Sequence, residues 1–210
     1  MDKQKSIDNF LYDGYKDFDI DRCNAGLTLM WIAGALVYIF GPEAWMCGIV
    51  FTVVNIITTV MASIIKKKYA NLKLARYLFD VLLCSWLTLF MTTADYRFFV
   101  AYDKHNNWLL YVGLLILSVS AVFVFALLCY YVIVRRKEEN KSVFKKVSTA
   151  TVVFAMSGYF LAPYISSAMN SDTDSTGVAC IGLMMSLGMA LCDGVALSKL
   201  YLFLKQKSDN

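Results

Sequence analysis

Six long apolar runs separated by shorter polar segments dominate the chain. The runs cover 24–40, 44–65, 77–93, 108–134, 147–169 and 176–198, and each is roughly 17–27 residues long. At a helical rise of about 1.5 Å per residue, these lengths match a hydrocarbon layer about 30 Å thick. Lipid offers no partner to bare backbone groups, so the runs must be helical. The pattern predicts an all-α, polytopic integral membrane protein, a bundle of six transmembrane helices.

The basic residues predict how this bundle is oriented. Eighteen of the twenty Lys and Arg residues lie in the segments 1–23, 66–76, 135–146 and 199–210, and only Arg97 and Lys104 lie in the alternate connections. Cytoplasmic loops carry an excess of Lys and Arg, so we expect the N and C termini to be cytoplasmic. The expected organisation is a cytoplasmic N-terminal segment, a transmembrane domain and a cytoplasmic tail, with the ranges 1–23, 24–198 and 199–210.

The composition agrees with a membrane protein and narrows its partners. The chain is 59% hydrophobic and only 17% charged, whereas soluble domains have about one-quarter charged residues. The net charge of +4 is best explained as an orientation signal with some attraction to anionic lipid. We therefore expect the lipid bilayer as a partner and no nucleic acid. The expected location is a bacterial cytoplasmic membrane, with a eukaryotic membrane as the alternative.

Two carboxylates inside the predicted spans are candidate functional groups. Asp80 lies three residues into the third run and Asp193 about five residues from the end of the sixth, so both are expected at similar depth near the cytoplasmic edge. Ionisable residues in membrane spans commonly mark ion or proton pathways. The simpler interpretation is structural, because Arg76 precedes Asp80 by one helical turn and Lys199 can reach toward Asp193.

Asn55 is the third candidate, since it lies at the middle of the second run. A buried amide needs a partner, which we expect on the third helix at Ser85 or Thr88, or on the fourth at Ser118 or Ser120. Interhelical hydrogen bonds of this kind commonly serve packing. With the nearby threonines Thr52, Thr58 and Thr59, Asn55 could also line a polar cavity.

The sixth run carries a stripe of small residues, each four positions apart: Gly182, Ser186, Ala190, Gly194 and Ser198. At this spacing the small side chains lie on one helix face, where a neighbouring backbone can approach closely. The fifth run has a partial counterpart in Gly158, Ala162 and Ser166. The stripe therefore predicts either an internal contact between these two helices or the seam of a homodimer.

The ends of the spans carry further aromatic and cysteine residues. In the connection 94–107, the aromatic residues resemble an interfacial belt: Tyr96, Phe98, Phe99 and Tyr102, with Trp108 at its edge. Phe10, Leu11, Tyr15 and Phe18 lie in an acidic N-terminal segment that could form a short helix on the membrane surface, although a partly ordered tail packed against the bundle is the simpler expectation. Cys47 and Cys180 are expected at matching depth near the outer boundary, so a disulfide between them is conceivable, although two free thiols are the simpler expectation.

No enzyme is predicted, because no catalytic constellation is found. The chain has one histidine, His105, which no cysteine or second histidine accompanies, so neither a metal site nor a cofactor is expected. Two classes of function remain. The first is a small transporter, channel or permease subunit for a solute or ion, with Asn55, Asp80 and Asp193 along its pathway. The second is a non-catalytic accessory, assembly, regulatory or immunity protein. It would form a homo-oligomer or bind another membrane protein through its helices.

Overall fold

In the computed structural model, the described residues are 7–8, 10–11, 19–39, 45–69, 72–103, 108–136 and 173–208, and they are helical almost throughout. The five long helices of this part are α2 (Ile20–Ile39), α3 (Trp45–Ile64), α4 (Lys73–Asp103), α5 (Trp108–Arg136) and α7 (Thr173–Ser208). A π-helical segment, η2 (Ile65–Tyr69), continues α3 into its basic end. The all-helical prediction is confirmed for the described residues.

Four of these helices contain stretches long and apolar enough to cross a membrane: Gly48–Tyr69, Lys73–Arg97, Tyr111–Val134 and Gly182–Ser208. In α2 the apolar stretch identified among the described residues, Cys23–Ile32, is shorter. The predicted span 147–169, with Gly158, Ala162 and Ser166, lies outside the described residues. These findings indicate an integral membrane protein.

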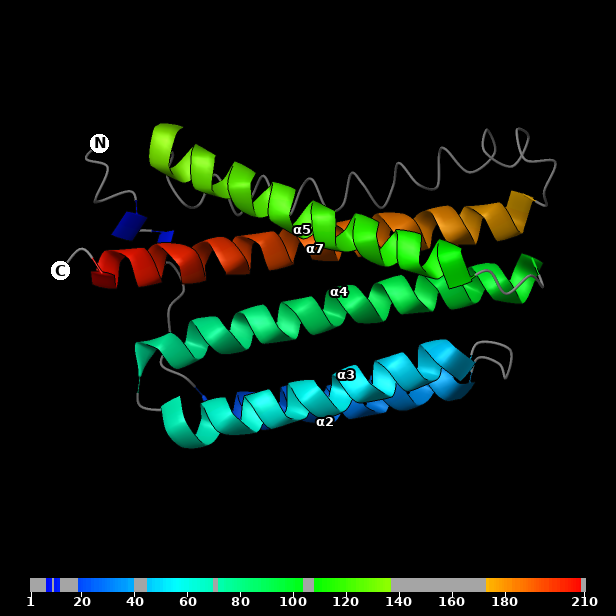
Figure 1. The fold of residues 1–210 in the computed structure, drawn as a ribbon, viewed down its shortest axis with the longest axis horizontal. Coiled ribbons are helices and arrows are strands. Elements are labelled where there is room, and N and C mark those ends of the chain that lie inside the picture. Colours follow the sequence, from blue (N-terminus) through cyan, green and yellow to red (C-terminus); the bar gives the residue numbers. More distant parts are fainter. Residues whose placement is uncertain are drawn as a thin grey trace.

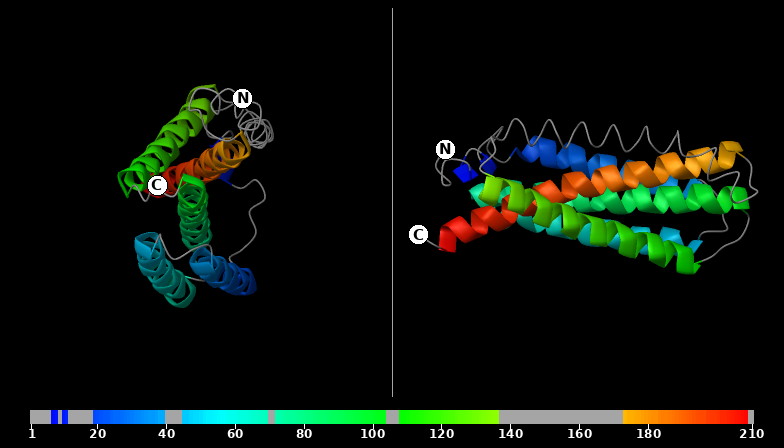
Figure 2. Two further views of the ribbon diagram at one scale, coloured as in Figure 1. Left: turned by 90° about the vertical axis from the view of Figure 1, so that its right-hand side faces the viewer. Right: turned by 90° about the horizontal axis from the view of Figure 1, so that it is seen from above.

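Helix α4 is the centre of the described bundle. Figures 1 and 2 show the α2–α3 pair on one side of α4 and the α5–α7 pair on the other. Met30, Phe51 and Trp86 form the core between α2, α3 and α4, where the Trp86 ring lies 5.5 Å from the Phe51 ring. On the opposite side α4 packs extensively against α7, which runs antiparallel to it. Aliphatic side chains on the outer faces of α3 and α5 are exposed, as expected for helices that contact lipid.

The described N-terminal residues join the base of the α4–α7 pair. Phe10 and Leu11 are buried in a cluster with Tyr77, Ile133 and Leu202. The Tyr77 hydroxyl donates a hydrogen bond to the Leu11 carbonyl at 2.9 Å. These two residues pack against the bundle as expected, and they lie at the same end as the C-terminal part of α7.

The prediction that 94–107 is a connecting segment is wrong for most of its length. Helix α4 continues to Asp103, ten residues beyond the expected end of the third span. Tyr96 is buried inside the bundle, where its ring lies 5.0 Å from that of Tyr111, and it therefore does not contribute to an aromatic belt. Residues 104–107, with His105, lie outside the described part.

Candidate functional site

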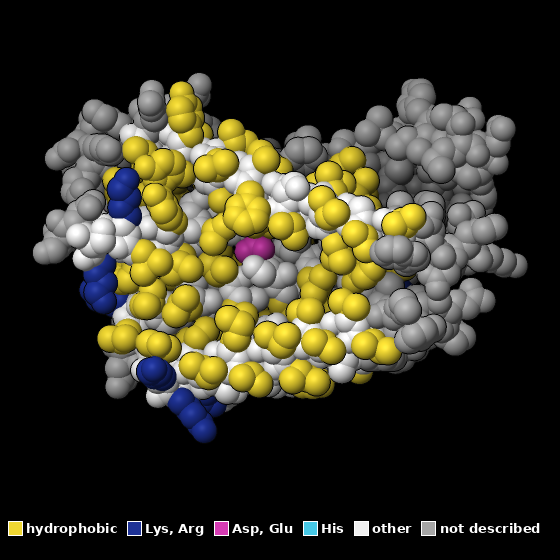
Figure 3. All heavy atoms as spheres, viewed as in Figure 1, with side chains coloured by type: hydrophobic (Ala, Val, Ile, Leu, Met, Phe, Trp, Pro, Cys, Tyr) yellow, Lys and Arg dark blue, Asp and Glu magenta, His cyan; other side chains and the backbone are white. Residues whose placement is uncertain are grey.

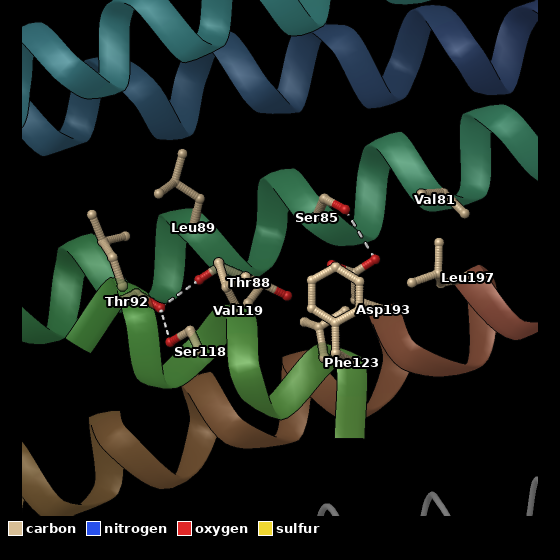
Figure 4. Close-up of a pocket in the computed structure, with 12 residues that line it drawn as sticks. Val81, Ser85, Thr88, Leu89, Thr92, Ser118, Val119, Phe123, Asp193 and Leu197 are labelled. Carbon is tan, nitrogen blue, oxygen red and sulfur yellow. Dashed lines mark hydrogen bonds between the residues drawn. The ribbon is translucent and has the colours of Figure 1, made fainter. Parts of the chain in front are cut away.

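Asp193 is the more deeply buried of the two candidate carboxylates. It is 3% exposed on α7 and faces α4, where the Ser85 hydroxyl donates a hydrogen bond to its Oδ1 at 3.0 Å (Figure 4). In the described part of the chain Ser85 is its only hydrogen-bond partner, and no Lys or Arg forms an ion pair with it. Ser85 lies at the middle of the apolar stretch Lys73–Arg97. Asp193 therefore lies level with the middle of this apolar stretch.

The expectation that Asp80 and Asp193 lie at similar depth is not met along α4. The partner of Asp193, Ser85, follows Asp80 by five residues, which is about 7 Å of helical rise along α4. The sixth apolar run ends at residue 198, whereas α7 continues to Ser208, so Asp193 lies farther from the end of its helix than the run suggests.

Asp80 forms the local ion pair that its sequence spacing suggested. The Arg76 Nε donates to the Asp80 Oδ2 at 3.0 Å, and the Asp80 side chain is 40% exposed. Lys199, the expected neighbour of Asp193, instead has its Nζ 5.3 Å from the centre of the Phe10 ring. Asp80 is thus the better compensated of the two carboxylates.

A cavity of about 290 Å³ lies where α4, α5 and α7 meet, and Asp193 is part of its wall. Four hydroxyl groups also line it, those of Ser85, Thr88, Thr92 and Ser118 (Figure 4). The Thr92 and Ser118 hydroxyls are 2.8 Å apart, so they link α4 to α5. The remaining wall is apolar and includes Leu89, Leu115, Val119, Val122, Phe123 and Leu197. The cavity combines one buried carboxylate with a mainly apolar lining.

One side of this cavity reaches the outer surface of the bundle. Val119 and Phe123 on α5 line the cavity and are 55% and 59% exposed. Their neighbours Ile116 and Leu127 on the same helix are also exposed apolar side chains. Figure 3 shows an acidic side chain in the middle of this face among mainly hydrophobic side chains, with Lys and Arg toward one end. The cavity mouth thus lies on a surface suited to contact with hydrocarbon.

Asn55 lies elsewhere, and the expected partners were wrong. It is 2% exposed at the α2–α3 contact, where its Nδ2 donates to the Met30 carbonyl of α2 at 3.5 Å. The absence of a side chain at Gly34 of α2 provides the space for this amide, because a Cβ there would lie 2.8 Å from the Asn55 Nδ2. The hydroxyls of Thr52, Thr58 and Thr59 bond to carbonyls of their own helix. The structure does not bring Asn55 or Asp80 to the cavity that Asp193 lines.

The small-residue stripe of α7 serves contacts within the chain. A Cβ on Gly194 would lie 2.8–3.0 Å from atoms of Phe125, Ala126 and Val122 on α5. The Ser198 hydroxyl donates to the Ala126 carbonyl at 2.8 Å. Ser186 and Ala190 are buried as well. The contacts described for the stripe are thus made to α4 and α5, whereas the predicted partner at 147–169 lies outside the described residues.

A second buried carboxylate, Asp95, was missed from the sequence. It was assigned to a connecting segment, but it lies on α4 and is buried against Gly182 of α7. Its Oδ1 has no hydrogen-bond partner among the described residues. A signal was present, since Ser85, Thr88, Thr92 and Asp95 recur every three or four residues and so lie on one face of the helix.

The side chains of Cys47 and Cys180 lie outside the described part, so the expectation of two free thiols, with a disulfide as the alternative, stays a prediction. No three His, Cys, Asp or Glu side chains are grouped as metal ligands within the described helices. Comparisons with protein-family models, with curated proteins and with solved structures find no match for this chain.

Proposed function

We propose that this protein is a small membrane transporter, channel or permease subunit that moves a cation, with Asp193 as the group that binds it. The observation that carries the proposal is the Asp193 carboxylate, buried at the middle of the spans beside a cavity of about 290 Å³. Asn55 and Asp80, the other candidates, are assigned structural roles. Asn55 joins α2 to α3, and Asp80 pairs with Arg76.

The energetic cost of this carboxylate supports a role in binding. A charged side chain at the centre of a bilayer is costly, and such residues usually face a cavity or pair with one another. Asp193 lines a cavity, and in the described part of the chain its one hydrogen-bond partner is the neutral Ser85 hydroxyl. A cation in the cavity would compensate the negative charge where no described basic side chain does so.

The proposal includes the topology expected from the sequence. It has six transmembrane helices and cytoplasmic N and C termini, in a cell membrane that we place in a bacterium. The described Lys and Arg side chains lie mainly toward one end of the bundle (Figure 3), which supports this orientation because cytoplasmic loops carry an excess of these residues. Access of an impermeant thiol reagent to a cysteine introduced at 104, but not at 140, would test it in intact cells.

The alternative, a non-catalytic accessory protein that acts through helix–helix contacts, has less support. Its main evidence was the stripe of α7, which packs against α4 and α5 of the same chain. A homo-oligomer or a second membrane protein would therefore dock on another surface, such as the exposed apolar faces of α3 or α5.

Cation flux in reconstituted vesicles tests the proposal. Wild-type protein should carry Na⁺, K⁺, H⁺ or a small organic cation down an imposed potential, and Asp193→Asn should abolish this flux because the amide keeps the shape but removes the charge. Asp80→Asn is the matched control and should retain flux. Equal flux in wild type and Asp193→Asn, or no cation flux in the wild type, would contradict the proposal.

A further inference from the structure

The walls of the Asp193 cavity indicate which kind of cation it accepts. We propose that the cavity binds an organic monocation with an apolar body, a protonated or quaternary amine, which enters from the hydrocarbon layer between α4 and α5. This inference rests on the proposed function and narrows its substrate class.

The polar groups of the cavity are too few for a bare inorganic ion. Calcium takes six to eight oxygen ligands, and potassium filters replace the hydration shell with rings of carbonyls. One carboxylate and four hydroxyls line the cavity, and all four hydroxyls already have hydrogen-bond partners; the Thr88 hydroxyl donates to the Cys84 carbonyl at 3.0 Å. Ser85 donates to Asp193, and Thr92 interacts with both the Thr88 carbonyl and Ser118. A protonated or quaternary amine carries a single positive charge, which one carboxylate compensates.

The rest of the lining suits the apolar part of such a molecule. Small-molecule sites are lined mainly by apolar side chains with a few polar groups that fix the orientation, and the cavity follows this composition. Its volume of about 290 Å³ is near the lower end of such sites, which fits a cation carrying about one ring. The Phe123 ring shares the cavity with Asp193, so it adds an aromatic face that attracts cations.

The position of the mouth determines the route of entry. Val119 and Phe123 line the cavity and are exposed on α5, among other exposed apolar residues near the middle of the stretch Tyr111–Val134. A hydrated inorganic ion would have to lose its water to approach from this side. An amphipathic cation partitions into the bilayer and meets the mouth directly.

Binding of benzyltrimethylammonium to the protein in phosphatidylcholine nanodiscs tests the inference. We expect saturable binding that Asp193→Asn weakens at least about tenfold, because truncating one partner of a buried charge pair costs at least this much. The neutral isostere neopentylbenzene should fail to compete, as should tetramethylammonium, which lacks the apolar body. Asp80→Asn should bind normally. Val119→Trp, at an exposed position, should slow binding by narrowing the mouth and so provides a test that does not alter the buried carboxylate.

The outcomes separate this inference from the proposed function. Flux of Na⁺, K⁺ or H⁺ that depends on Asp193 but is not inhibited by benzyltrimethylammonium would overturn the substrate class and leave cation transport standing. Equal competition by neopentylbenzene would overturn the role of charge in recognition. Absence of any cation flux that depends on Asp193 would overturn both proposals.

Discussion

The Ser85 hydroxyl and the Asp193 carboxylate connect α4 and α7 across 108 positions of sequence. The bond lies at the middle of the apolar stretch of α4, on the wall of the cavity. A hydroxyl that donates to a carboxylate stabilises its charged form without neutralising it. The hydrogen bond therefore holds the Asp193 carboxylate in a fixed position between α4 and α7.

Loss of this hydrogen bond should destabilise the bundle. We expect Ser85→Ala to lower the free energy of unfolding by about 1–2 kcal/mol, above the average for interhelical hydrogen bonds in membranes, because a buried carboxylate loses its hydrogen-bond partner. The control is Ser63→Ala, since Ser63 is exposed and its hydroxyl bonds to the Thr59 carbonyl of its own helix. Unfolding in detergent is the measurement. A Ser85→Ala variant as stable as Ser63→Ala would show that the bond does not hold α4 to α7.

The close approach of α7 to α5 should be sensitive to a single methyl group. We expect Gly194→Ala to destabilise the protein by about 1–3 kcal/mol, because the new Cβ would meet the backbone of Val122 and Ala126. Gly113→Ala is the matched control, since among the described residues no atom apart from the neighbouring turns of its own helix lies within 4 Å of the Cβ position there. The measurement is the thermal stability of Gly194→Ala compared with that of Gly113→Ala. A similar change in both would mean that α5 does not pack closely on Gly194.

Asn55 should affect stability but not transport. Asn55→Ala removes the bond to the Met30 carbonyl, and interhelical hydrogen bonds in membranes contribute about 0.6 kcal/mol on average. We therefore expect a small loss in unfolding free energy and unchanged cation flux. Loss of flux at nearly normal stability would return Asn55 to the pathway and contradict its assignment to the α2–α3 contact.

The helices could be predicted from the sequence more readily than their contacts. Apolar runs located the starts of α3 and α5 within one residue, because burial in lipid requires long uninterrupted apolar helices. The same criterion ended the third span at residue 93, although α4 continues to Asp103. In a hydropathy pattern a charged residue such as Asp95 marks the end of a predicted span. In the fold, however, this side chain is buried against Gly182.

The candidate site could not be fully predicted from the order of residues along the chain, because it depends on how α4 and α7 pack together. Asp193 was identified as an ionisable residue in a span, but its partner Ser85 follows from the register of α4 against α7. That register depends on how the two helices pack, including the contact of Gly182 with Asp95, and cannot be obtained from either segment alone. Pairs within one helix were predictable, as Arg76 and Asp80 demonstrate, because their separation of four residues already places them together.

Infrared difference spectroscopy of the carboxyl bands tests most directly whether Asp193 binds the cation. Protein in phosphatidylcholine vesicles would be exchanged between buffers with and without Na⁺, K⁺ or benzyltrimethylammonium, and Asp80→Asn would serve as the control. We predict that at least one cation shifts a carboxyl band in wild type and in Asp80→Asn, and that Asp193→Asn lacks this shift. A cation-induced band that persists unchanged in Asp193→Asn, or no carboxyl change in the wild type with any of the three cations, would contradict the account.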